Sequence, residues 1–173
     1  MAKENSKSVL MIVAHNNFRD EEYTAAREKL EKNGTKITVA STTTNGARST
    51  QGMQINPDVL LDAVNADDYD AVVFVGGSGA SQYWHDAKAH EIACHAASHG
   101  KVVAASSHAA VTLAVAGLLK DKTVTGHVAV YEKLTVQGAN YSGKKLEIDG
   151  NIITSSGANA AREFAEALVN SLN

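Results

Sequence analysis

Ser107 is the residue whose surroundings most clearly favour chemistry. It follows a mainly apolar stretch, residues 101–106, that is typical of a buried strand, and a helical pattern begins directly after it. Alanines lie two positions to either side, at Ala105 and Ala109. Because a sharp turn from strand to helix tolerates only small neighbours, this pattern indicates a nucleophile elbow, which holds the central side chain at the strand end. The positive end of the following helix would favour an anion there.

Further chemical groups follow the ends of two other predicted strands. Residues 16–22 come after the first apolar run, and Gly76 and Gly77 come after the fourth strand. Ligands of open α/β sheets bind outside the carboxyl ends of the strands, so we expect both segments to meet Ser107 on one rim. Glycine amides can approach a ligand oxygen, and we predict an oxyanion hole from Gly76, Gly77 and the amide of His108. The same glycines also suit a tight turn that needs positive φ.

Apolar runs and helical patterns alternate along the chain. The runs predict strands at 8–14, 36–41, 53–55, 71–75, 101–106, 123–125, 146–149 and 151–154. Helical spacing predicts helices at 20–33, 57–64, 87–99, from the elbow to 117, 129–137 and 158–172, and residues 42–51 are predicted to form a loop. This alternation indicates an α/β fold with a mostly parallel sheet and helices on both faces.

Composition narrows the class of protein. The 173 residues suit one domain, residues 1–173, and the net charge of -3 with scattered basic residues predicts no nucleic-acid partner. No apolar stretch approaches the roughly 20 residues that span a bilayer, so we expect no membrane partner. Residues 1–7 are polar and lack an apolar signal region. Because the one cysteine, Cys94, excludes an internal disulfide, we expect a cytoplasmic protein.

Several segments together resemble the DJ-1/PfpI superfamily, a group with the class I glutamine amidotransferase-like fold. The resemblance covers residues 8–172 and is carried by 17–23 (NFRDEEY), 73–77 (VFVGG), 104–110 (AASSHAA), 116–119 (AGLL) and 123–127 (TVTGH). It implies a flavodoxin-like three-layer sandwich and a homo-oligomer, a dimer or larger. Members are glyoxalases or deglycases of small dicarbonyls and their adducts, isonitrile-modifying enzymes, intracellular peptidases, chaperones and redox sensors.

The resemblance also assigns roles to residues. The elbow residue of the family is cysteine, here Ser107, and a glutamate from the first helix lies near it. Glu22 falls on the register of that glutamate, with Glu21 as the alternative. His127 matches a histidine that is delivered to the site. His108 matches one that pairs with the nucleophile in peptidase-like members, although residues 78–82 contain no carboxylate where the peptidase acid is expected.

Serine at the elbow changes the expected chemistry. A cysteine thiol, with a pKa of about 8.5, ionises readily at such a turn, whereas a serine hydroxyl needs a positioned general base. Two interpretations stay open. In the leading one, Ser107 replaces a cysteine, through laboratory substitution or evolution, and the nucleophile is lost or weakened. In the other, Ser107 is active and His108, His127 or Glu22 is its base.

These interpretations give three functional hypotheses, and whether the chain is an enzyme stays open. The first is a hydrolase or a glyoxalase- or deglycase-like protein with Ser107 at the nucleophile position, acting on a small carbonyl or amide substrate. The second is a non-catalytic stress-response, chaperone or metabolite-binding protein. The third is a serine hydrolase or an intracellular PfpI-type peptidase. None of them requires a cofactor.

One helical segment carries metal-binding residue types. His90 and Cys94 are four residues apart, as are His95 and His99, so each pair shares a helix face. No third or fourth ligand is evident in the sequence, so we expect no metal site and interpret Cys94 as a packing residue. Tyr83 and Trp84 follow the glycines and either line the site, make a subunit contact or pack against neighbouring elements.

Overall fold

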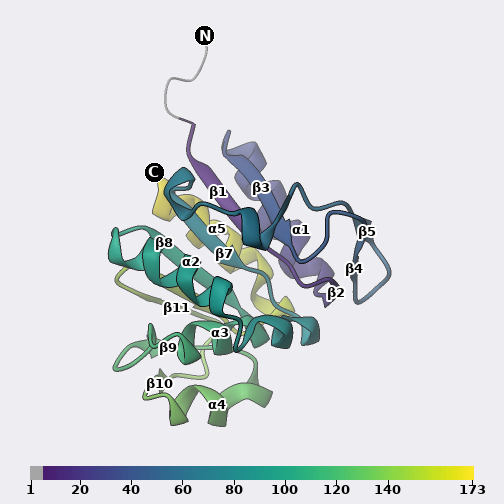
Figure 1. Ribbon diagram of the computed structural model, residues 1–173. Helices are drawn as coiled ribbons and strands as arrows, with labels where there is room; N and C mark the ends of the chain where they lie inside the picture. Colours follow the sequence, from purple (N-terminus) through teal and green to yellow (C-terminus); the bar gives the residue numbers. More distant parts are fainter. Residues whose placement is uncertain (1–5) are drawn as a thin grey trace.

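A seven-stranded sheet forms the centre of the computed structural model, which describes residues 6–173 (Figure 1). The strand order is β11-β12-β8-β7-β1-β3-β6, and only the β11–β12 pair is antiparallel. The strands are β1 (Ser8–Ile12), β3 (Lys36–Ser41), β6 (Val59–Leu60), β7 (Ala71–Phe74), β8 (Val102–Ser106), β11 (Leu146–Asp149) and β12 (Ile152–Ser155). The five parallel strands β3-β1-β7-β8-β12 follow the flavodoxin-like order, which confirms the predicted fold class.

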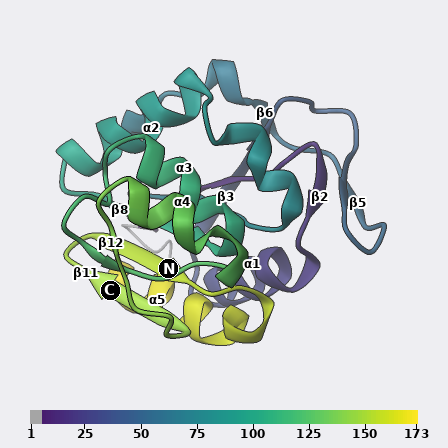
Figure 2. The same cartoon turned by 90° about the horizontal axis from the view of Figure 1, so that it is seen from below.

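Helices cover both faces of this sheet (Figure 2). Helices α1 (Asp20–Lys32) and α5 (Ala161–Leu172) pack side by side on one face, and α2 (Ala87–Ser98), α3 (Ala110–Val115) and α4 (Tyr131–Val136) belong to the other side. Successive β1 side chains enter opposite cores, with Val9 and Met11 on the α1 and α5 face and Leu10 and Ile12 on the α2 face. This explains why the run is continuously apolar instead of alternating.

Two predicted elements are wrong in type. Residues 57–64 form no α-helix: they contain the edge strand β6 followed by a 3₁₀ turn, Leu61–Ala63. The cause is a long-range pairing, because the Asp58 amide donates to the Val39 carbonyl at 2.8 Å and the Asp58 carboxylate accepts the Val39 amide at 2.8 Å. The predicted loop 42–51 contains a strand, β4 (Ala47–Ser49).

Two small sheets lie outside the central one. Strand β4 pairs with β2 (Asn16–Phe18) and β5 (Gln54–Ile55), and β9 (Thr123–Val124) pairs with β10 (Asn140–Tyr141). The predicted strand at 53–55 therefore forms in part, but it does not join the central sheet. No helix within residues 6–173 has the length and apolar character to cross a bilayer. Most of the polar start, residues 1–5, lies outside the described residues.

The central strand β1 gives a direct stability test. Leu10 is 0% exposed, so Leu10→Ala should lower the free energy of unfolding by about 2–5 kcal/mol through lost burial and the remaining cavity. Leu60→Ala is the matched control, because Leu60 is 47% exposed and its loss should cost less than about 1 kcal/mol. Urea unfolding followed by circular dichroism measures both values, and equal losses would contradict the assignment of β1 to the core.

Candidate active site

Ser107 turns the chain from strand β8 into the helical segment that follows. Ser106 is still extended and Ala110 is already helical, while Ser107 between them has a φ of +46°. A residue with a Cβ rarely adopts this left-handed backbone conformation. Ser107 is nearly inaccessible, with 2% of the residue exposed, and its Oγ accepts a hydrogen bond from the Gly77 amide at 3.1 Å. This is the geometry of the predicted elbow.

The two glycines after β7 form a matched pair with the two serines after β8. The Gly76 amide donates to Ser106 Oγ at 2.9 Å, and the Gly77 amide donates to Ser107 Oγ. A Cβ on Gly76 would collide with Ser107 Oγ and with Oε1 of Glu22. Gly77 has a φ of +105°. Of the predicted oxyanion donors, the Gly76 amide is occupied by Ser106 Oγ and the Gly77 amide by Ser107 Oγ, so only Gly77 faces the elbow oxygen, and an oxyanion hole that includes the amide of His108 stays a prediction.

Glu22 lies beside Ser107 in a buried position. It belongs to the first turn of α1, is 3% exposed, and its Oε1 has no hydrogen-bond partner among residues 6–173. Burial raises the pKa of its carboxyl, although the hydroxyls of Ser106 and Ser107 and the charge of Arg19 oppose this increase. A carboxyl with a raised pKa keeps its proton to higher pH and can then donate a hydrogen bond.

Glu21 lies on a different side of the first turn. It accepts a hydrogen bond from Arg19 Nε at 2.7 Å and another from Gln51 Nε2 at 3.3 Å. A backbone amide and the Arg19 guanidinium hold the pKa of Glu21 below its ordinary value. The geometry therefore brings Glu22, and not Glu21, to the elbow.

His108 and His127 stack on one another. Their ring centroids are 4.3 Å apart and the planes differ by 24°. His127 Nδ1 accepts the Ala129 amide at 3.0 Å, so the neutral ring carries its proton on Nε2. Burial, with a smaller effect of His127, lowers the pKa of His108, whose Nδ1 is buried without a partner. Within the described part of the chain, no hydrogen bond joins either ring to Ser107 Oγ.

A cavity of about 730 Å³ opens beside these residues, a size that suits a small molecule. Ser107, Glu22, Gly77, His108 and His127 all line it. Residues 156–159, which follow β12, also line the cavity, and the sequence analysis did not single them out. Because they too follow the carboxyl end of a parallel strand, the rule that located the other segments would have located them.

Tyr83 and Trp84 each donate a side-chain hydrogen bond to a backbone carbonyl. The Tyr83 hydroxyl donates to the Val13 carbonyl at 2.7 Å in the core. The Trp84 indole N–H donates to the carbonyl of His108 at 2.9 Å, and the ammonium of Lys133 lies 5.3 Å from the Trp84 ring centroid. Neither aromatic residue lines the cavity: Tyr83 packs in the core and Trp84 fixes the elbow backbone, while a subunit contact of either stays a prediction.

Strand order and elbow together define an α/β protein of the flavodoxin-like class, with a cavity at the carboxyl ends of its parallel strands. The sequence model of the DJ-1/PfpI family matches residues 7–171, and the chain belongs to that family.

Individual relatives agree with this assignment. The chain is 38% identical to the uncharacterized protein MJ0967 of Methanocaldococcus jannaschii, over 94% of this chain and 82% of that protein. It is 27% identical to the deglycase PfpI of Pyrococcus furiosus, over 84% of this chain and 88% of that protein. The crystal structure of a ThiJ/PfpI domain protein from Brachyspira murdochii superposes with a TM-score of 0.94 at 32% identity and covers 98% of both chains.

The buried carboxyl of Glu22 predicts a pH-dependent stability difference. Its pKa is raised on folding, so its contribution to stability is complete below the ordinary value of 4.5 and is lost as the pH rises through the folded pKa. Glu22→Gln cannot titrate. We therefore expect the stability of the unmodified chain relative to Glu22→Gln to fall as the pH rises from 4.5, measured by denaturant unfolding at several pH values.

Glu21→Gln is the matched control for this series. The pKa of Glu21 is lowered, so its contribution is present above 4.5 and is lost as the pH falls, which is the opposite sign. A difference between the unmodified chain and Glu22→Gln that does not vary with pH would contradict the buried, proton-retaining carboxyl.

Proposed function

We propose that this chain is a glyoxalase- or deglycase-like member of its family that binds a small carbonyl compound, with Ser107 at the position of the nucleophile. The observation that carries the proposal is Ser107 Oγ, held at a left-handed elbow against the Gly77 amide and beside buried Glu22. The names of two relatives support the activity class: the deglycase PfpI of Pyrococcus furiosus and the glutathione-independent glyoxalase DJR-1.2 of Caenorhabditis elegans.

The same geometry supports binding more than turnover. Serine attacks a carbonyl only when a base removes its proton. The carboxyl of Glu22 lies beside Ser107, but burial raises its pKa and so favours the protonated form, which donates a hydrogen bond instead of accepting a proton. His108 and His127 make no hydrogen bond to Ser107 Oγ in the described residues. We infer that the hydroxyl positions a carbonyl compound and that attack on it is slow.

Cysteine at this position would need no such base. Its thiolate would form a C–S bond to the carbonyl carbon while the C=O π electrons move to the oxygen. The Gly77 amide, which here donates to the elbow atom, would turn to the oxyanion together with the amide of His108, and the carboxyl of Glu22 would supply its proton. The product of this addition is a hemithioacetal, and His127 would assist later proton transfers.

A carbonyl-binding protein without turnover is the second candidate function. It is favoured by the absence, within residues 6–173, of any hydrogen bond from a histidine to Ser107 Oγ. The peptidase alternative has less support, because the 3₁₀ turn Ser78–Tyr83 beside the cavity contains no carboxylate.

We also infer a cytoplasmic homo-oligomer. The exposed side chains Val128, Tyr131 and Val136 offer apolar surface for a second copy.

Ser107→Cys tests the proposed scaffold directly. We expect methylglyoxal consumption at least about tenfold above that of the unmodified chain, because a thiolate forms at neutral pH and a serine alkoxide does not. Loss of dicarbonyl, measured with a hydrazine reagent, gives the rate. Ser107→Ala provides the baseline, and the double variant Ser107→Cys with Glu22→Gln should lose most of the gain. A Ser107→Cys variant that folds, by circular dichroism, but is no faster than Ser107→Ala would reject the proposal.

A fluorophosphonate probe separates the serine-hydrolase alternative. Because burial favours the protonated form of Glu22 and no histidine within residues 6–173 makes a hydrogen bond to Ser107 Oγ, we expect no covalent labelling between about pH 6 and pH 9, as measured by intact-protein mass spectrometry. Labelling of the unmodified chain that is absent from Ser107→Ala would instead establish an activated serine.

A further inference from the structure

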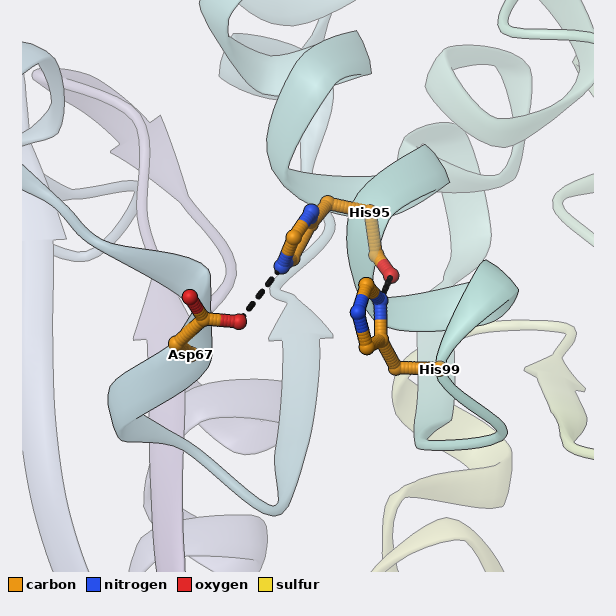
Figure 3. A group of neighbouring side chains, drawn as sticks. All are labelled: Asp67, His95 and His99. Atoms are coloured by element: carbon orange, nitrogen blue, oxygen red, sulfur yellow. Dashed lines mark hydrogen bonds and ion pairs between the residues drawn. The ribbon is translucent and has the colours of Figure 1, made fainter.

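Helix α2 and the 3₁₀ turn Ala66–Asp68 bring three ligand-type side chains together away from the cavity (Figure 3). His95 lies in the last turn of α2, His99 is the residue directly after the helix end at Ser98, and Asp67 comes from the turn packed against α2. One ligand atom from each residue lies within 4.8 Å of those of the other two. None of the three lines the cavity of Ser107.

The hydrogen bonds of these side chains fix which ring nitrogen of His99 is available to an ion. His99 Nδ1 lies 2.8 Å from the His95 carbonyl oxygen, which can only accept, so Nδ1 carries the proton and Nε2 keeps its lone pair. A ring N–H that donates to a backbone carbonyl is the usual support of a metal-binding histidine. His95 Nε2 lies 2.6 Å from Asp67 Oδ1, with a single proton between them.

We propose that Asp67, His95 and His99 form a surface site for a divalent transition-metal ion of the Zn²⁺ type. Two imidazole nitrogens and one carboxylate oxygen suit Zn²⁺, Ni²⁺ or Cu²⁺ and do not suit Mg²⁺ or Ca²⁺, which prefer oxygen ligands. Asp67 is exposed, so water can complete a tetrahedral set. The sequence analysis found no third ligand because Asp67 lies 28 positions before His95.

Binding requires the three side chains to move. The His95 and His99 rings, whose centroids are 4.2 Å apart with planes 33° apart, must turn so that a nitrogen lone pair of each ring points at the ion. Ligands of tetrahedral Zn²⁺ at about 2.0–2.1 Å lie roughly 3.3 Å apart, so the ion takes the place of the proton and separates His95 from Asp67 by roughly 0.7 Å. The side chains of His95 and Asp67 are 37% and 61% exposed and are free to adjust. The ammonium of Lys101 donates to the Ala66 and Asp67 carbonyls and opposes any cation by charge. Affinity must therefore come from direct ligation.

Isothermal titration of the full chain with ZnCl₂ tests the site. We expect one Zn²⁺ per chain at this site, with at least tenfold weaker binding in His95→Gln, His99→Gln and Asp67→Asn. His85→Gln is the matched control, because this exposed histidine lies just before α2, outside the cluster. MgCl₂ should give no binding heat.

His127→Gln tests for competition from the cavity and should leave the affinity for Zn²⁺ unchanged. Zn²⁺ should also raise the melting temperature of the unmodified chain and not that of His99→Gln, because only a folded site binds the ion. No Zn²⁺ binding by the unmodified chain would overturn the proposal. Equal affinity for Zn²⁺ in the unmodified chain and in His99→Gln would also overturn it, because the contact between His99 and His95 would then be only a hydrogen bond at the helix end.

Discussion

The site depends on one backbone constraint, the left-handed conformation of Ser107. For a residue with a Cβ this conformation costs about 1–2 kcal/mol, and it persists because the surrounding structure leaves no alternative. The β7–β8 ladder ends at Phe74, and from there serine hydroxyls replace backbone carbonyls as acceptors of the next two glycine amides. The hydrogen-bond pattern of the sheet is thereby extended by side chains, and it fixes where the oxygen of Ser107 points.

The same packing raises the pKa of the carboxyl beside the elbow. Gly76 has no side chain, and the space that a Cβ would fill is taken by the Ser107 hydroxyl and the carboxyl of Glu22. Glu22 is consequently removed from water, and its pKa is raised by that burial. A carboxyl that keeps its proton to higher pH assists a nucleophile that is already ionised, but in its protonated form it cannot activate one that still holds its proton. The identity of one atom, sulfur or oxygen, therefore decides what an otherwise unchanged cavity can do.

Local signals in the sequence were sufficient for much of this arrangement. The continuous apolar run of β1 and the small residues around Ser107 depend on near neighbours, so the parallel sheet and the elbow could be predicted. Distant partners decided the rest. Residues 57–64 contain an edge strand because Asp58 pairs with Val39 across the sheet edge. The register of the resemblance favoured Glu22, and the alternative Glu21 is set aside only by the position of the Glu22 carboxyl beside Ser107 Oγ and Gly76. No local pattern contains that information.

The hydrogen bond from the Trp84 indole to the His108 carbonyl has a practical consequence. Trp84 is the single tryptophan of the chain, and its N–H donates a hydrogen bond to the carbonyl oxygen of His108, the residue after Ser107. Indole emission shifts in wavelength and intensity with the polarity and hydrogen bonding of its environment. The protein thus contains an intrinsic optical sensor one residue from the elbow, with no competing tryptophan signal, so occupancy of the cavity can be followed in solution without a label.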